Sequence, residues 1–192
     1  MSRLSQITLF GFLCVKFVFS TSAFAQNETQ AFEARNALYL ELGGSSGRYA
    51  LNYIMIIHQK DKLKLNVSAG FGLWHYTYSF GPNGPKETTW LPAIPVEFSA
   101  FWGRSNHHLE LGIGMISYLE SISQLNFDTF EETRKIMYRT AFPLRIGYRY
   151  QKPGGGFFFR IGYTPFVNLP ILGKENWNFE PRFAGISIGK SF

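Results

Sequence analysis

Between residues 136 and 150, apolar side chains and arginines alternate with a period of two residues. One side of an extended chain would carry Ile136, Tyr138, Phe142, Leu144, Ile146, Tyr148 and Tyr150, and the other side Arg139, Arg145, Gly147 and Arg149. A helix would scatter these arginines around its circumference, whereas a strand collects them on one face. The segment is therefore predicted to be a β-strand with one apolar and one charged face.

The same alternation recurs along the chain after residue 36. Further strands are predicted at Leu38–Gly43, Tyr49–Ile57, Leu63–Leu73, Ile94–Trp102, Leu109–Met115, Phe157–Thr164 and Phe183–Phe192. Short polar turns such as Gly103–Asn106 alternate with longer connections at Gly81–Trp90, Ser121–Lys135 and Asn168–Glu180. Because transmembrane barrels have tight turns at one end and longer loops at the other, the pattern predicts an all-β, eight-stranded antiparallel up-and-down barrel over residues 36–192.

Residues 1–25 have the features of a cleavable signal peptide. Arg3 precedes the apolar run Ile7–Val15, and Ala23–Ala25 forms a small-x-small cleavage site. Lys16 interrupts the apolar run, which disfavours a retained membrane helix. We therefore expect a mature chain that begins at Gln26, with residues 26–35 as an N-terminal periplasmic segment.

Cysteine usage and charge exclude several kinds of function. Cys14 is the only cysteine and lies in the predicted leader, so the mature chain would have no disulfide and no cysteine metal site. Removing Arg3 and Lys16 leaves 17 basic and 13 acidic residues, a net charge of 17 − 13 = +4. The basic residues are scattered rather than clustered, so nucleic acid is not expected as a partner.

Alternation alone allows two barrels that differ in which face is outside. In a soluble, lipocalin-like carrier the apolar face lines a ligand cavity and the charged face meets water. In a transmembrane barrel the faces are reversed. The polar faces are rich in glycine, including Gly70, Gly112 and Gly162, and carry few charges, whereas a soluble surface carries many lysines and glutamates. We therefore expect the apolar face to contact lipid.

Four segments carry a resemblance to a known class of protein: Tyr39–Gly44, Leu109–Gly114, Phe159–Pro165 and the terminal Phe183–Phe192. With these strand motifs the chain resembles the small outer-membrane β-barrel proteins of Gram-negative bacteria. The resemblance implies a location in the outer membrane, a monomer, and contact with outer-membrane lipid and lipopolysaccharide. It also implies that Phe192 belongs to the signal read by the barrel-insertion machinery.

With the apolar face outside, seven charged residues are predicted to point into the barrel. They are Glu41, Glu97, Glu110, Arg139, Arg145, Arg149 and Arg160. An eight-stranded barrel has an interior just wide enough for side chains to fill, and buried charges need partners. These residues are expected to form an ion-pair network that fills the lumen, consistent with a structural or surface-interaction role.

The chemistry-bearing residues are few. His75 and Ser79 share one face of a predicted strand, so a histidine could activate a hydroxyl there. A lipid A-modifying enzyme is therefore kept as an alternative, although no acid that would orient His75 can be identified. His107 and His108 are adjacent on a strand, point to opposite faces and cannot readily share a metal ion. Neither a metal nor a cofactor is expected.

Overall fold

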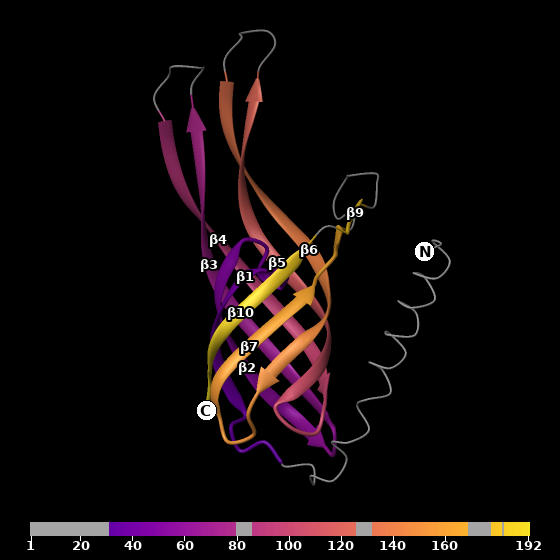
Figure 1. Ribbon diagram of the computed structural model, residues 1–192. Coiled ribbons are helices and arrows are strands. Elements are labelled where there is room, and N and C mark those ends of the chain that lie inside the picture. Colours follow the sequence, from indigo (N-terminus) through magenta and orange to yellow (C-terminus); the bar gives the residue numbers. More distant parts are fainter. Residues whose placement is uncertain (1–30, 80–85, 126–131, 169–177, 182) are drawn as a thin grey trace, which may run out of the picture.

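The computed structural model describes residues 31–79, 86–125, 132–168, 178–181 and 183–192. The barrel wall in Figure 1 consists of β1 (Asn36–Gly43), β2 (Tyr49–Lys60), β3 (Leu63–Ser79), β4 (Lys86–Trp102), β5 (His107–Leu125), β6 (Glu132–Gln151), β7 (Gly156–Tyr163) and β10 (Ala184–Ser191). Shorter elements lie in the connections: the 3₁₀ turn η2 (Gly44–Ser46) and the strands β8 (Phe166–Asn168) and β9 (Asn178–Glu180).

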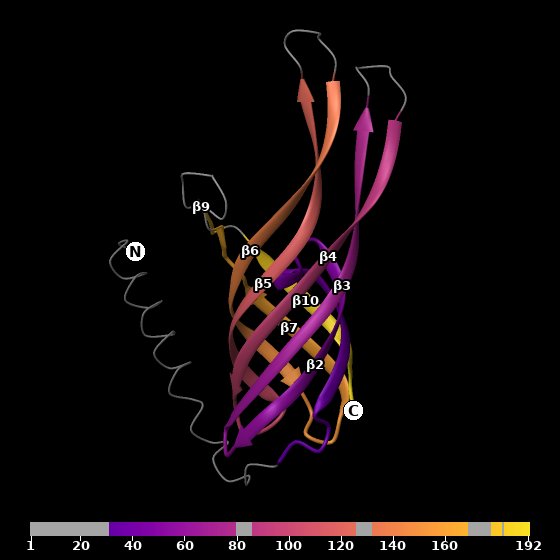
Figure 2. The ribbon, with the colours of Figure 1, turned by 180° about the vertical axis from the view of Figure 1, so that it is seen from behind.

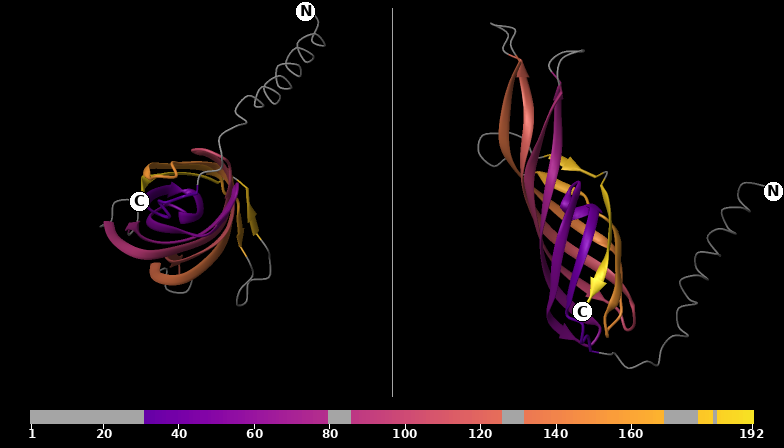
Figure 3. Two further views of the ribbon diagram at one scale, coloured as in Figure 1. Left: turned by 90° about the horizontal axis from the view of Figure 1, so that it is seen from below. Right: turned by 90° about the vertical axis from the view of Figure 1, so that its left-hand side faces the viewer.

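Each wall strand pairs antiparallel with its neighbours, and β1 and β10 close the ring, as the view along the barrel in Figure 3 shows. Closure leaves no free edge in the wall. The prediction of an all-β, eight-stranded antiparallel barrel is confirmed. The predicted leader, residues 1–25, lies outside the described residues. No helix in the described part of the chain is long and apolar enough to cross a membrane, a finding that does not bear on crossing by strands.

The two faces of the wall strands differ in polarity. On β1, Leu38 and Leu40 point outward and are each 47% exposed, whereas Glu41 points inward and is 1% exposed. On β10, Ile188 points outward and Ser187 is fully buried. Successive side chains of a strand point to opposite faces, so the sequence parity carries directly into this arrangement. The apolar face therefore lies on the outside of the barrel.

Four wall strands continue beyond the barrel as two separate ribbons (Figures 1 and 2). β4 pairs with β5 only as far as Ala93↔Tyr118. Past this point β3 pairs only with β4, up to Ser79↔Lys86, and β5 pairs only with β6, up to Leu125↔Glu132. We call these extensions the β3–β4 ribbon and the β5–β6 ribbon.

The ribbons correct the predicted loops at Gly81–Trp90 and Ser121–Lys135. Strand structure begins at Lys86 and takes up most of the second predicted loop, through Leu125 and again from Glu132. The apolar alternation fades in these segments, which is why strands were not predicted there. Thr88, Thr89 and Ile122 nevertheless favour extended backbone, and cross-strand partners stabilise it.

Chain outside the wall packs into both ends of the barrel. After β1, the η2 turn folds inward and its residues are buried. At the opposite end Phe32 is buried, with its ring centroid 5.6 Å from that of Phe101 and 5.5 Å from that of His108. The backbone N–H of Ala34 donates to the Pro153 carbonyl at 3.0 Å. The described part of the predicted periplasmic segment thus packs against the barrel.

Candidate functional site

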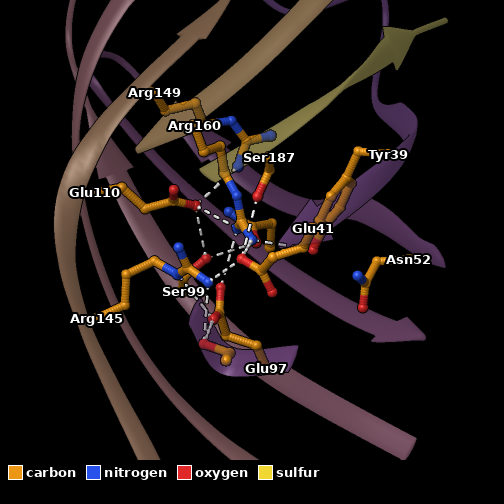
Figure 4. Close-up of polar contacts among 12 residues, drawn as sticks. Tyr39, Glu41, Asn52, Glu97, Ser99, Glu110, Arg145, Arg149, Arg160 and Ser187 are labelled. Carbon is orange, nitrogen blue, oxygen red and sulfur yellow. Dashed lines mark hydrogen bonds and ion pairs between the residues drawn. The ribbon is translucent and has the colours of Figure 1, made fainter. Parts of the chain in front are cut away.

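Three glutamates and three arginines meet in the barrel interior (Figure 4). They are Glu41 on β1, Glu97 on β4, Glu110 on β5, Arg145 and Arg149 on β6, and Arg160 on β7. Each side chain is at most 3% exposed. On each strand these residues alternate with the exposed apolar residues. Because successive side chains of a strand point to opposite faces, all six point inward. We call these six residues the lumen network.

Two arginines hold the network together. Arg145 bridges two carboxylates, with Nη2 2.5 Å from Glu41 Oε1 and Nε 2.9 Å from Glu97 Oε2. Arg160 reaches all three glutamates: its Nη2 lies 3.2 Å from Glu41 Oε1, and its Nη1 lies 3.0 Å from Glu97 Oε1 and 3.2 Å from Glu110 Oε1. The planar, multidonor guanidinium suits this sharing, because several N–H groups can serve different carboxylates at once.

Arg149 extends the network toward the turn end of the barrel. Its Nη1 lies 3.1 Å from Glu110 Oε1, and its Nε donates to Gln151 Oε1 at 2.9 Å. Its guanidinium also lies 4.0 Å from the ring centroid of Phe101 and 4.9 Å from that of Phe158. The charge is therefore satisfied by one carboxylate, one amide and two aromatic faces.

The lumen network is electrically balanced, with three carboxylates against three guanidinium groups. A buried charge without a partner is strongly unfavourable, whereas charge-assisted hydrogen bonds between buried groups compensate much of the lost hydration. Every glutamate of the network contacts at least two arginines. Loss of any one side chain would leave its partners with uncompensated charge.

The η2 turn completes the carboxylate coordination. The backbone N–H and the hydroxyl of Ser46 donate to Glu41 Oε2 at 3.1 and 2.6 Å, and the Ser45 hydroxyl donates to Glu97 Oε2. Gly44 allows the approach: its φ is +58°, and a Cβ there would lie 2.7 Å from Glu41 Oε1. The short connection at Gly44–Gly47 is thus part of the lumen rather than an external loop.

Arg139 does not belong to the lumen network, contrary to the prediction. It lies on the β5–β6 ribbon, where its Nε is 3.1 Å from Glu120 Oε2, and the two side chains are 28% and 34% exposed. Parity correctly assigned Arg139 to the same face of β6 as Arg145. Parity cannot, however, show that β6 leaves the barrel between these two arginines, so that the face is partly exposed at Arg139 and buried at Arg145.

Apolar side chains fill the lumen on both sides of the network. The ribbon side holds a cluster of Trp74, Ala93, Ile116, Ala141 and Phe166. The turn side holds two clusters, one of Ala37, Tyr39, Ile54 and Phe158 and one of Phe32, Ile56 and Phe101. The lumen is therefore layered, with the charges between apolar caps.

Sequence reasoning missed most of these lumen residues because it treated the inward faces as polar. The signal that could have found them is parity. Phe101 shares the parity of Glu97, and Phe158 shares that of Arg160. Tyr39 shares the parity of Glu41, and its hydroxyl accepts from Arg160 Nη2 at 3.1 Å.

Of the two candidate catalytic residues, the structure describes the side chain of His75 only. His75 is on the outer face of β3, with its ring 5.6 Å from that of Trp90. In the described part of the chain no carboxylate lies within ion-pair distance of His75. Ser79 ends β3, and its side chain lies outside the described part. A lipid-modifying role for these residues stays a prediction.

The two adjacent histidines separate as expected from strand geometry. His107 Nδ1 lies 2.5 Å from the Tyr148 hydroxyl on the outer surface, whereas His108 is buried inside. The described residues contain no group of three or more His, Cys, Asp or Glu side chains that could hold a metal ion.

Each carboxylate of the lumen network accepts hydrogen bonds from guanidinium groups and from at least one serine hydroxyl. The lumen network is therefore the candidate functional site of the barrel. Comparison of the sequence with protein-family models, with curated proteins and with solved structures finds no match.

Proposed function

We propose that this chain is an outer-membrane β-barrel protein with a filled lumen and a structural or surface-interaction role in the cell envelope. The observation that supports this most directly is the inverted polarity of the barrel wall. Six charged residues are buried at the centre of the barrel. Each wall strand also presents leucine, isoleucine or phenylalanine side chains on its outward face. Transmembrane barrels have the same distribution, with an apolar outer face in contact with lipid hydrocarbon and a polar interior.

At the height of the lumen network, exposed apolar side chains of neighbouring strands form a continuous outward surface, which we call the outer belt. Neighbouring strands present Phe98, Ile113 and Leu144, which are paired in register and are 44%, 56% and 40% exposed. In water, apolar surface of this extent is unfavourable, and in monomeric soluble proteins it is rare. A lipocalin-like carrier would need the opposite arrangement, with an apolar cavity inside.

Aromatic residues near the turn end of the wall support the same proposal. Trp102 at the end of β4 is 57% exposed, and Tyr148 projects outward on β6 beside His107. Amphipathic rings of this kind concentrate where a membrane meets water. Phe192 lies exposed at this end, in the position proposed for the insertion signal. Lipid and lipopolysaccharide would then surround a monomeric barrel.

An arginine substitution on the outer belt tests the proposal. Ile113→Arg is expected to lower the free energy of unfolding from lipid vesicles by about 2–4 kcal/mol, because the guanidinium would face hydrocarbon. Thr88→Arg, on the β3–β4 ribbon, is the matched control and should change it by less than about 0.5 kcal/mol. The measurement is urea unfolding in vesicles. The folded fraction is read from the heat-dependent mobility of the barrel in gels. If both variants behave alike and the protein fractionates with soluble material, the membrane proposal is wrong.

A further inference from the structure

A cavity of about 200 Å³ lies on the ribbon side of the lumen network, at the mouth of the barrel. Its walls come from the β1–β2 turn, both ribbons and the chain around β8 and β9. Five of its eleven lining residues are aromatic: Trp74, Tyr76, Tyr118, Phe166 and Phe183. Ile116 and Ala141 close the bottom, where the buried apolar cluster separates the cavity from the charges below.

The rings of the lining are packed against one another. Trp74 and Tyr118 have ring centroids 5.0 Å apart, and Phe166 and Phe183 meet edge to face at 4.7 Å. The indole N–H of Trp74 donates to the Tyr49 carbonyl at 3.1 Å. These contacts hold the walls in place before any ligand arrives, and a preformed site loses less entropy on binding.

Arg48 stands at the rim as a pre-oriented cation. Its guanidinium lies 4.4 Å from the ring centroid of Tyr76 and 5.4 Å from that of Trp74, and its Nη1 donates to the His75 carbonyl at 2.9 Å. None of the described carboxylates lies within ion-pair distance of Arg48. Its remaining N–H donors can therefore serve an anionic group at the mouth of the cavity.

Two acidic residues line the cavity together with Arg48. Glu120 lies 3.1 Å from Arg139, so its carboxylate is already paired. Glu180, which also lines the cavity, has its own interaction partner. A carboxylate placed against Arg48 would thus gain a charge-assisted hydrogen bond, while its apolar body entered the aromatic walls.

We propose that this cavity binds a small planar aromatic carboxylate, with the ring between the aromatic walls and the carboxylate on Arg48. The volume fits the assignment, since a dry apolar cavity of about 150 Å³ accommodates a benzene ring. This ligand site adds a recognition function to the barrel and does not depend on what surrounds the outer wall.

Calorimetric titration of the folded, detergent-solubilised protein tests the site with three probes of one ring system: indole-3-acetate, indole and tryptamine. Saturable binding is expected for indole-3-acetate, weaker binding for uncharged indole and the weakest for tryptamine. Arg48→Gln should weaken indole-3-acetate binding by about tenfold, as the loss of a charged hydrogen bond predicts, and leave indole unchanged. Arg104→Gln, at a turn on the opposite end, is the matched control.

Ala141→Leu supplies a second arm, because the larger side chain would occupy the cavity floor and should abolish binding of both indole and indole-3-acetate. Heat-dependent gel mobility shows whether each variant is folded. If the Ala141→Leu variant does not fold, the comparison of Arg48→Gln with Arg104→Gln tests the proposal by itself. The proposal is overturned if the native protein gives no saturable binding of indole-3-acetate, if tryptamine binds more tightly, or if Arg48→Gln binds like the Arg104 control.

Discussion

Arg160 and Glu41 are 119 positions apart in the chain, yet Arg160 Nη2 lies 3.2 Å from Glu41 Oε1 in the middle of the lumen. The contact spans β10, which pairs with β1 on one side and with β7 on the other. It can therefore form only after the last strand has closed the barrel. Network assembly and barrel closure are therefore coupled.

Arg145→Met should be strongly destabilising. It would leave the buried Glu41 and Glu97 without a principal partner, which predicts a loss of about 3–5 kcal/mol in the free energy of unfolding. Arg139→Met removes the same charge from a half-exposed pair and should change stability by less than about 1 kcal/mol. Equilibrium unfolding of both variants in the same detergent or lipid makes the comparison, and equal losses would contradict the burial of the network.

Gly44→Ala should destabilise the barrel although it adds only one methyl group. The residue has φ +58°, and the new Cβ would approach Glu41 Oε1 to 2.7 Å, so the η2 turn must shift away from the network. The expected loss is about 1–3 kcal/mol. Gly154→Ala is the control, because a Cβ there meets nothing within 4 Å. Thermal unfolding of the two variants should differ clearly, and a neutral Gly44 variant would show that the turn is not held in the lumen.

Phe32→Ala should open the turn end of the barrel. Phe32 covers Lys64, whose Nζ lies 5.3 Å from the ring centroid and donates to the Gly103 carbonyl at 3.1 Å. Acylation of Lys64 by an amine-selective reagent, followed by peptide mass spectrometry, is expected to accelerate by about tenfold or more as local opening becomes easier. Phe157→Ala, which removes an outward ring, should leave the rate unchanged. Rapid labelling of Lys64 in the native protein would refute the capping role.

The native barrel should not conduct ions steadily. Buried apolar clusters flank the lumen network, one on the ribbon side and two on the turn side, and ion pairs hold the charges of the network in place, so we expect the lumen to resist steady ion flow. Planar bilayer recordings on purified, folded protein are the direct measurement. Large, steady, water-filled conductance would be incompatible with this layered lumen.

Much of the fold could be predicted because period two is a local property of each strand. The parity of Glu41 or Arg160 relative to its apolar neighbours determines which face it occupies, whatever strand lies beside it. The strand ends were harder to predict: the ribbons of β3 to β6 are stabilised by cross-strand partners rather than by an apolar face, so local alternation ends before they do.

By itself, the sequence determined the strand number, the antiparallel order and which face of each strand points inward, because these follow from alternation and connection length. Only the tertiary structure decided which of those side chains meet. Arg145 and Arg139 share one face of one strand, yet the first is buried between two glutamates and the second lies on a ribbon. The inward turn at Gly44 and the cap at Phe32 were likewise decided by barrel closure. The physical reason is that partners of a buried charge come from strands far apart in the chain, whose relative height depends on the register of the closed barrel.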